Sequence, residues 1–264
     1  MSTDTRADTD ADTDAEFAVS QDGHVATVII RRPPYNYANT DMIRRLADLF
    51  AGLDAQTDCR AIVLASEGKA FCAGADFSRD SEGAAGIDPA LFYHQAMRLF
   101  DGRKPIVAAV HGAAIGAGAG LALVADFRIV CPETRFSFNF NRLGFHPGFG
   151  LSYTLPRLIG MQKASLLFYT GRRIDGTEAM RIGLADDVVA RHDVLLHAQQ
   201  LAGEIAASAP MAVQSTRQTL HKDLAEQVRR VNARELDVQL KQFGSADFQE
   251  GVRAMAERRL PVFQ

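Results

Sequence analysis

Two runs of small residues have the composition and placement of a ligand-binding backbone. The first run, 112–120, follows the apolar stretch 106–110 and leads into a second apolar stretch at 121–125. The second run, 73–76, lies shortly after the apolar stretch 61–65. Where a strand ends and a helix begins, backbone N–H groups are unpaired, and Gly or Ala side chains let a ligand approach them. Two such turns could place two N–H donors on one oxygen and stabilise a carbonyl that becomes an enolate or oxyanion.

Each run also has a simpler explanation. Tight packing of a helix on a sheet accounts for the first, and an ordinary loop accounts for the second. A dinucleotide fingerprint needs the pattern G-x-G-x-x-G, but Gly116 and Gly118 are followed by Leu121 where the third glycine is required. The spacing therefore excludes that fingerprint.

The elements that must position these runs alternate between strands and helices up to about residue 190. Short apolar stretches predict strands, and apolar residues at helical spacing predict helices. The expected strands are 17–20, 25–31, 61–65, 106–110, 127–130, 136–138 and 184–189, and the expected helices are 40–53, 88–100, 150–159 and 163–169. From residue 192 onward the pattern is mostly helical. These elements predict an α/β fold with a helical C-terminal region.

Charge and composition exclude several classes of protein. The chain has 264 residues and a net charge of -3. Its first 16 residues carry six acidic side chains against Arg6 alone, so the rest of the chain is mildly basic. We expect residues 1–15 to be a disordered acidic tail. The net charge argues against a nucleic-acid partner, and the basic remainder suits an anionic small molecule.

Cysteine usage and one uncharged stretch bear on the compartment. Three cysteines without a C-x-x-C spacing predict neither a disulfide framework nor a thiolate metal site, and we expect a reducing cytoplasm and no metal. Residues 105–125 carry no formal charge over a length that could span a membrane. Eight alanines and four glycines make this stretch weakly hydrophobic, so we expect a buried strand, a glycine-rich turn and a buried helix, and no membrane partner.

Ordered motifs along the chain resemble one known family. These motifs are 30–33 (IRRP), 68–77 (GKAFCAGADF), 104–112 (KPIVAAVHG), 125–129 (ADFRI), 155–160 (LPRLIG), 170–174 (TGRRI), 178–185 (EAMRIGLA) and 250–259 (EGVRAMAERR). From about Phe17 to Phe263 the chain resembles the crotonase superfamily, the enoyl-CoA hydratase/isomerase family. The resemblance implies a spiral of β-β-α turns, with an acyl-CoA-binding core over 16–195 and a helical trimerisation region over 196–264. It implies a homotrimer or a dimer of trimers, and no cofactor beyond the coenzyme A of the substrate.

The resemblance also implies where the substrate is held. In the family, two backbone N–H groups bind the thioester carbonyl, and they fall at Ala75 and Ala117 in this chain. Ala117 replaces the middle glycine of a triple, and a backbone donor survives that change if φ stays allowed. The matching substrate-binding positions are Lys69, Ala73, Gly74, Asp76, Phe77, Gly116, Gly120, Asn139, Phe140 and Gly148. Lys69 fits the CoA phosphates, as does Arg258 or Arg259.

Both glutamates of the family's hydratases are missing. Their positions hold Gly120 and Phe140, and neither can transfer a proton. Histidine is the side-chain type suited to proton transfer near neutral pH, so His146 is the candidate catalytic acid or base, with His94 as the other candidate. Asn139 could orient a water.

Two other polar residues near these motifs are expected to be structural. We expect Asp76 to anchor its loop through a hydrogen bond, and His111 to occupy a structural position at a strand end.

Four phenylalanines surround the position of the second missing glutamate. Phe138, Phe140, Phe145 and Phe149 predict an aromatic pocket wall and a bulky or hydrophobic acyl group, although core packing explains two of the four equally well. We therefore expect an acyl-CoA-converting enzyme that stabilises a thioester enolate with non-standard acid/base residues. The alternatives are a hydrolase of the same fold, cleaving a thioester or a β-diketone, and a non-catalytic acyl-CoA-binding paralogue.

Overall fold

Two sheets form the centre of the protein, whose computed structural model describes residues 16–76 and 88–264. The larger sheet has the strand order β1 (Phe17–Asp22), β2 (Val25–Ile30), β3 (Ala61–Ser66), β5 (Ile106–Val110), β7 (Phe127–Val130) and β10 (Asp187–Val188). The smaller sheet has the order β4 (Ala70–Cys72), β6 (Ala113–Ile115), β8 (Arg135–Ser137) and β9 (Arg173–Asp175). Only β1 with β2 and β8 with β9 pair antiparallel in these sheets. The acidic tail expected at 1–15 lies outside the described residues.

The chain winds through both sheets in repeated strand–strand–helix turns. β3 and β4 lead to α2 (Pro89–Arg98), and β5 and β6 lead to α3 (Ala117–Ala122). β7 and β8 lead to the short 3-10 helix η1 (Asn139–Leu143) and then to α4 (Leu151–Ile159). A Cβ on Gly112, at the β5–β6 corner, would lie 2.6 Å from the backbone oxygen of Lys69, at the β3–β4 corner. Successive corners are therefore stacked in backbone contact, which confirms the expected spiral of β-β-α turns.

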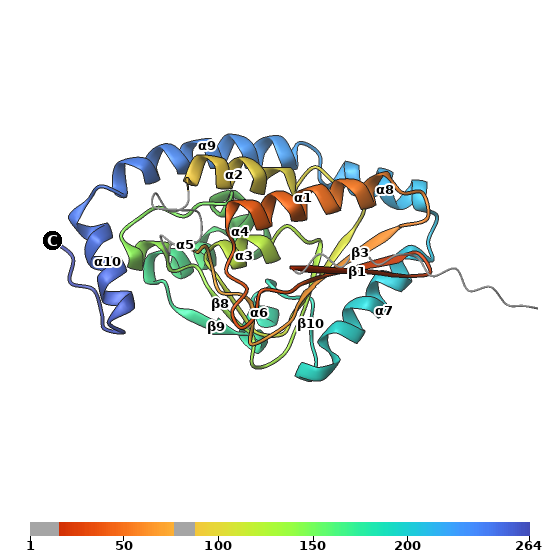
Figure 1. The fold of residues 1–264 in the computed structure, drawn as a ribbon, viewed down its shortest axis with the longest axis horizontal. Coiled ribbons are helices and arrows are strands. Elements are labelled where there is room, and N and C mark those ends of the chain that lie inside the picture. The colour runs from red at the N-terminus through yellow and green to blue at the C-terminus, as the bar shows by residue number, and fades with distance from the viewer. Residues whose placement is uncertain (1–15, 77–87) are drawn as a thin grey trace, which may run out of the picture.

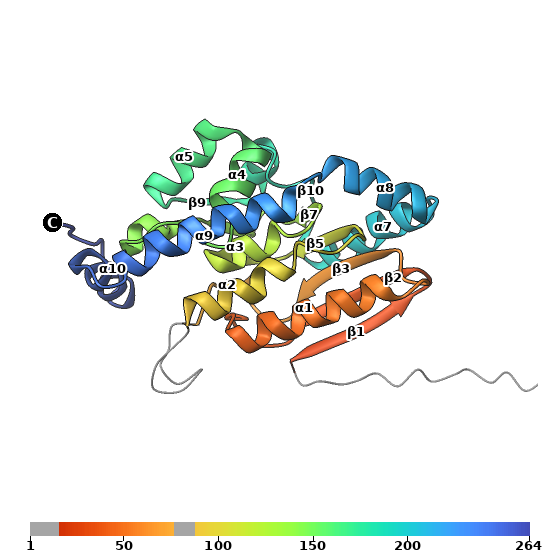
Figure 2. The ribbon, with the colours of Figure 1, turned by 90° about the horizontal axis from the view of Figure 1, so that it is seen from above.

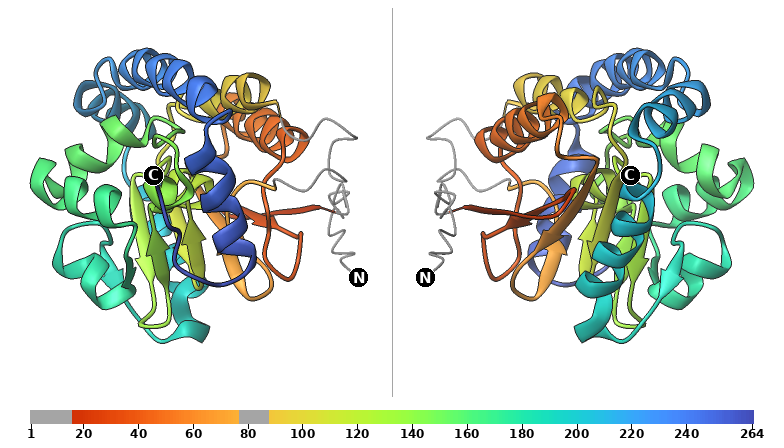
Figure 3. Two further views of the ribbon diagram at one scale, coloured as in Figure 1. Left: turned by 90° about the vertical axis from the view of Figure 1, so that its left-hand side faces the viewer. Right: turned by 90° about the vertical axis from the view of Figure 1, so that its right-hand side faces the viewer.

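Helices cover both faces of the larger sheet. On one face lie α1 (Thr40–Ala55), α2 and α9 (Leu224–Gln242), which Figure 1 shows side by side. On the other face α7 (Val194–Ala206) packs against strands β2, β3, β5 and β7 through a separate apolar cluster (Figure 3). The boundary expected at residue 195 falls within α7, so the first C-terminal helix is part of the layered core.

The remaining helices lie toward the ends of the molecule. Figure 2 shows α8 (Pro210–Leu220) at one end and α10 (Ala246–Ala256) at the other, joined by the length of α9. The other two are α5 (Met161–Thr170) and α6 (Gly176–Arg181). None of the helices in the described ranges has the length and apolar character needed to cross a membrane.

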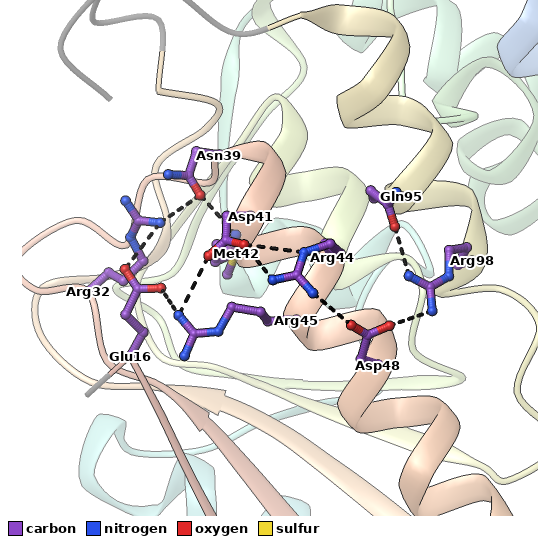
Figure 4. A network of polar contacts seen from close by, with 10 residues as sticks. All are labelled: Glu16, Arg32, Asn39, Asp41, Met42, Arg44, Arg45, Asp48, Gln95 and Arg98. Carbon is purple, nitrogen blue, oxygen red and sulfur yellow. Dashed lines mark hydrogen bonds and ion pairs between the residues drawn. The ribbon is translucent and has the colours of Figure 1, made fainter. Parts of the chain in front are cut away.

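A network of charged side chains sets α1 against its neighbours (Figure 4). Asn39 caps α1 by accepting a hydrogen bond from the Met42 N–H, and its side chain also accepts one from Arg32 at 2.8 Å. Asp48 of α1 and Arg98 of α2 form an ion pair at 2.6 Å. Exposed pairs of this kind contribute little to stability, but they fix how α2 lies along α1.

The uncharged stretch 105–125 folds almost as expected, with two differences. Ala113–Ile115 forms strand β6 where a turn was expected, because β4 and β8 supply hydrogen-bonding partners on its two sides. Between β5 and α3, non-strand residues remain only at the corner 111–112 and at Gly116, whose φ of +52° favours glycine, and α3 therefore begins at Ala117 rather than at Leu121.

Candidate functional site

A cavity of about 140 Å³ lies where the segment after β4, the start of α3 and the helix α2 meet. Most of its lining is apolar, and Tyr37, Tyr93 and Asn139 are the polar side chains among the described lining residues. The lining consists of Tyr37, Ala73, Gly74, Ala75, Pro89, Phe92, Tyr93, Ile115, Gly116, Ala117, Asn139, Phe140, Leu143, Phe145, Phe243 and Met255. The structure thus brings together Ala73, Gly74, Ala75, Gly116, Ala117, Asn139 and Phe140, all of which were predicted from the sequence.

The N–H group of Ala75 is directed away from its neighbouring segment. Ala75 and Ala38 form an isolated parallel bridge, in which the Ala38 N–H donates to the Gly74 carbonyl and the Asp76 N–H donates to the Ala38 carbonyl. Backbone groups alternate in direction along an extended chain, so the N–H of Ala75 points to the opposite side from Ala38. Within the described ranges no acceptor pairs with this N–H, and Ala75 lines the cavity.

The N–H group of Ala117 is free for a different reason. Ala117 is the first residue of α3, and the first N–H groups of a helix have no intrahelical acceptor. The preceding N–H, that of Gly116, donates to the Ser137 carbonyl at 2.9 Å, whereas none of the described carbonyls accepts from Ala117. The cavity is therefore lined by two residues with unpaired backbone donors.

Close backbone packing holds these two segments together. A Cβ on Gly118 would lie 1.9 Å from the backbone oxygen of Cys72, so any side chain at 118 would push α3 away from the end of β4. Cys72 is followed directly by the cavity-lining segment 73–75. The position of the Ala75 N–H therefore depends on the position of the Ala117 N–H at the start of α3.

The aromatic wall is made by two of the four expected phenylalanines. Phe140 and Phe145 line the cavity, with their ring centroids 5.4 Å apart in an edge-to-face arrangement. Phe138 packs instead against Phe168, and Phe149 packs against Phe92, both within the core. Two of the four phenylalanines therefore line the pocket, and the other two pack in the core, which was the alternative explanation for two of these positions.

Sequence comparisons identify the family. A family profile for enoyl-CoA hydratase/isomerase matches residues 20–264. The chain belongs to the enoyl-CoA hydratase/isomerase family. A short-chain-enoyl-CoA hydratase from Clostridium acetobutylicum is 30% identical over 246 residues, which cover 91% of this chain and 94% of that protein. A crotonyl-CoA hydratase from Syntrophomonas wolfei is 30% identical over 250 residues, covering 93% and 96% of the two chains.

Solved structures of this family have the same fold. The crystal structure of an enoyl-CoA hydratase/isomerase from Pseudoalteromonas atlantica superposes with a TM-score of 0.84 at 28% identity, covering 94% of this chain and all of that one. OdaA from Pseudomonas aeruginosa gives a TM-score of 0.82 at 28% identity, covering 92% and 99%.

The two positions at which the resemblance places the hydratase glutamates are filled by phenylalanine rings. A Cβ on Gly120 would lie 2.6 Å from Cγ of Phe149, so Gly120 packs against that ring and does not line the cavity. Phe140 does line it, at the second position. Among the described lining residues there is no carboxylate and no imidazole.

His146 lies outside the cavity. Its backbone is held by α9, because its N–H donates to the Gln242 side chain and its carbonyl accepts from the Gln239 amide, both at 2.7 Å. Its ring lines a different hollow beside Arg230 and Arg234. This placement does not support His146 as the acid or base. His94 is no substitute, since it is exposed on α2 and does not line the cavity.

The other expected binding residues surround the cavity without lining it. Lys69 is exposed on the β3–β4 corner, and the Asp76 N–H donates to Ala38, as expected for a loop anchor. Gly148 lies behind the cavity wall, and Phe77 is outside the described residues. His111 bonds through Nε2 to the Gly68 carbonyl at 3.1 Å, which is the expected structural role.

Some lining residues were not predicted, and the most informative is Tyr93. The buried face of α2 consists of Phe92, Tyr93, Ala96 and Met97, at helical spacing. That spacing could have shown that Tyr93 faces inward and His94 outward. Phe243 and Met255 had no comparable signal, because they reach the cavity from the distant C-terminal segment around α10.

No metal cluster was expected, and the described part of the chain has no group of three or more His, Cys, Asp or Glu side chains that could hold a metal ion.

Proposed function

We propose that the protein is an acyl-CoA-converting enzyme that binds a thioester carbonyl between the N–H groups of Ala75 and Ala117 and stabilises the enolate formed from it. The observation that carries this proposal is the pair of unpaired backbone donors on one small apolar cavity. Donors fixed before the reaction stabilise developing negative charge, and removing one of them commonly costs about 10²–10³ in rate. The names of the relatives as short-chain-enoyl-CoA and crotonyl-CoA hydratases support a CoA thioester as the substrate.

The acid/base chemistry differs from that of a two-glutamate hydratase. Gly120 packs against Phe149, and Phe140 lines the cavity with an aromatic ring. Neither position therefore supplies a group that can carry a proton. The polar side chains in the described lining are hydrogen-bonding groups, namely Tyr37, Tyr93 and Asn139. We infer that the reaction uses the polarised thioester with acid/base groups other than the family's carboxylates.

Mass spectrometry in D₂O identifies the reaction. The protein is incubated with saturated, 2-enoyl, 3-enoyl and aromatic CoA thioesters. Solvent deuterium at the α-carbon, gain of water or a shifted double bond supports enolate chemistry. Release of free CoA indicates the hydrolase instead. Binding of the thioesters with no mass change in any of them indicates a non-catalytic binding protein.

One substitution removes a donor without adding a large group. Ala117→Pro deletes the N–H of the first residue of α3, a position at which helices tolerate proline. The matched control is Met161→Pro, at the first residue of α5, which also follows a glycine, is exposed and does not line the cavity. We expect Ala117→Pro to lower α-deuterium exchange by about 10²–10³-fold and Met161→Pro to leave it unchanged. Equal rates in both variants would reject the Ala117 donor.

The remaining family properties are also proposals. Large apolar side chains are exposed on the C-terminal helices, including Met211, Leu220 and Leu240, and we propose that this region assembles a homotrimer. Light scattering after size exclusion measures that assembly. Lys69 remains the proposed contact for the CoA phosphates, whereas Arg259 already forms ion pairs with Glu250 and Glu257. We further propose a reducing compartment such as the cytoplasm, where three buried free cysteines stay reduced.

A further inference from the structure

One buried polar side chain lines the cavity. Tyr93, on α2, lines the cavity while only 8% exposed, among the aromatic side chains Phe92, Phe140 and Phe145. Tyr37 is 43% exposed, so its hydroxyl can be satisfied by solvent. A buried hydroxyl in apolar surroundings is costly unless its hydrogen-bonding capacity is used.

The side chain of Gln239, on α9, lies near the Tyr93 hydroxyl, and its orientation decides whether it offers that hydroxyl a donor or an acceptor. The Nε2 of Gln239 donates to the His146 carbonyl at 2.7 Å, and this bond fixes the orientation of the amide. The reverse orientation would place Oε1 against that carbonyl oxygen, and two acceptors repel each other. The amide therefore presents Nε2, which can only donate, on the side of Gly148 where the Tyr93 hydroxyl also lies.

The hydrogen of the Tyr93 hydroxyl remains to be donated. Among the described residues no acceptor is paired with the Tyr93 hydroxyl, and the nearby Nε2 of Gln239 can only donate to its oxygen. Burial raises the pKa of Tyr93 above its ordinary value, and the charge of Glu235 raises it further. Tyr93 is therefore a neutral donor at every physiological pH.

Gly148 makes room for this arrangement. A Cβ at position 148 would lie 2.1 Å from the Tyr93 hydroxyl oxygen and 2.6 Å from Nε2 of Gln239. The turn at 146–150 is itself held to α9, because Glu235 accepts from the Gly150 N–H at 2.7 Å and from the Ser152 N–H at 2.9 Å. The hydroxyl is thus fixed by α2, by α9 and by the absence of a side chain at 148.

We propose that Tyr93 is a specificity-determining residue that donates a hydrogen bond to an oxygen on the acyl group, so that preferred substrates are CoA thioesters carrying a carbonyl, hydroxyl or ether oxygen beyond the thioester. This inference rests on the proposed function and names the substrate class of the same site. The cavity of about 140 Å³ is close in volume to cavities that hold a benzene-sized group, which limits the acyl group to a short chain or one ring.

Matched thioester pairs test the inference by calorimetric binding. The pairs are butanoyl with 3-oxobutanoyl, pentanoyl with 4-oxopentanoyl, and benzoyl with 4-methoxybenzoyl CoA. One hydrogen bond predicts that the wild type binds the oxygen-bearing member of at least one pair about five- to tenfold more tightly. Tyr93→Phe should abolish that preference while changing the affinity of the hydrocarbon member less than about twofold.

Two further variants complete the design. Gly148→Ala should also abolish the preference, because its methyl group displaces the hydroxyl, whereas Tyr37→Phe should retain it. A preference that survives Tyr93→Phe, or equal affinity within every pair for the wild type, would overturn the specificity role and leave thioester binding standing. If none of the thioesters binds to the wild type, the proposed function fails together with this inference.

Discussion

The ring of Phe149 occupies the space that a side chain on Gly120 would need, since a Cβ at position 120 would lie 2.6 Å from Cγ of that ring. Phe149 has a positive φ of 65°, is buried in the core and packs edge-on against Phe92. The position that the family resemblance assigns to the first hydratase glutamate is therefore packed against a second, aromatic residue. Restoring the carboxylate alone cannot restore the site.

A pair of substitutions tests this coupling. Gly120→Glu should lower the free energy of unfolding by more than about 2 kcal/mol, because it forces a charged side chain into packed aromatic surroundings. Adding Phe149→Ala should make Gly120→Glu less damaging than it is in the wild-type background, which gives a favourable coupling energy in the double-mutant cycle. Urea unfolding of the four proteins measures it. Additive effects would show that the ring and position 120 are independent.

Two glycine-to-alanine substitutions in helices should have opposite effects. Gly203, in the last turn of α7, has open space around it, so Gly203→Ala should raise Tm by about 2 °C through the better helix propensity of alanine. Gly118→Ala should lower Tm and also slow α-deuterium exchange, because its Cβ meets the Cys72 carbonyl. Thermal scans and the exchange assay report both quantities. Normal exchange in Gly118→Ala would show that the contact of α3 with β4 does not position the donors.

Alanine substitutions at Phe138 and Phe140 should have different effects, one on stability and the other on the preferred length of the acyl group. Phe138→Ala removes a fully buried ring that packs on Phe168, and we expect a loss of about 3–5 kcal/mol with no change in acyl preference. Phe140→Ala enlarges the cavity, so it should cost less stability and shift binding toward longer acyl chains. Dissociation constants over a series of chain lengths, together with urea unfolding, test both. The same chain-length shift in Phe138→Ala would contradict the assignment of the wall.

Acid should destabilise the protein in part through His111. Burial lowers the pKa of His111 below its ordinary value of about 6.5, and Arg191 lowers it further, against an opposing hydrogen bond to Gly68. The unfolded chain then binds the proton more readily, so this contribution to stability is present above pH 6.5 and is lost as the pH falls below it.

Urea midpoints measured between pH 7.5 and pH 5.5 should therefore fall, and His111→Gln should reduce the slope without abolishing it. Burial also lowers the pKa of His221, so part of the dependence of stability on pH should remain in the His111→Gln variant. An NMR titration that placed the pKa of His111 above 6.5 would contradict the argument.

The sequence predicted the backbone of the site better than its side chains. Ala75 and Ala117 follow from the placement of small residues after strands and from the family motifs, and both line the cavity. His146 does not line the cavity, and its backbone is held by two glutamines of α9 that are more than 90 residues away along the chain. Tyr93 was overlooked beside His94 although the helical spacing placed it on the buried face. Long-range contacts of α9 and α10 with the cavity leave no local pattern, so Phe243 and Met255 required the structure.

The cavity takes its walls from residues as far apart in the chain as Tyr37 and Met255. At about 5–20 residues per second, a ribosome needs roughly 10 to 45 s to synthesise the chain between them. For roughly 8 to 31 s of that time, between the synthesis of Arg98 and that of Met255, the apolar face of α2 exists without the segments that complete the pocket. The complete pocket is therefore formed only after α10 has been made, and a truncated protein that ends before α10 should bind the acyl group more weakly, because it lacks the Met255 wall although both backbone donors are in place.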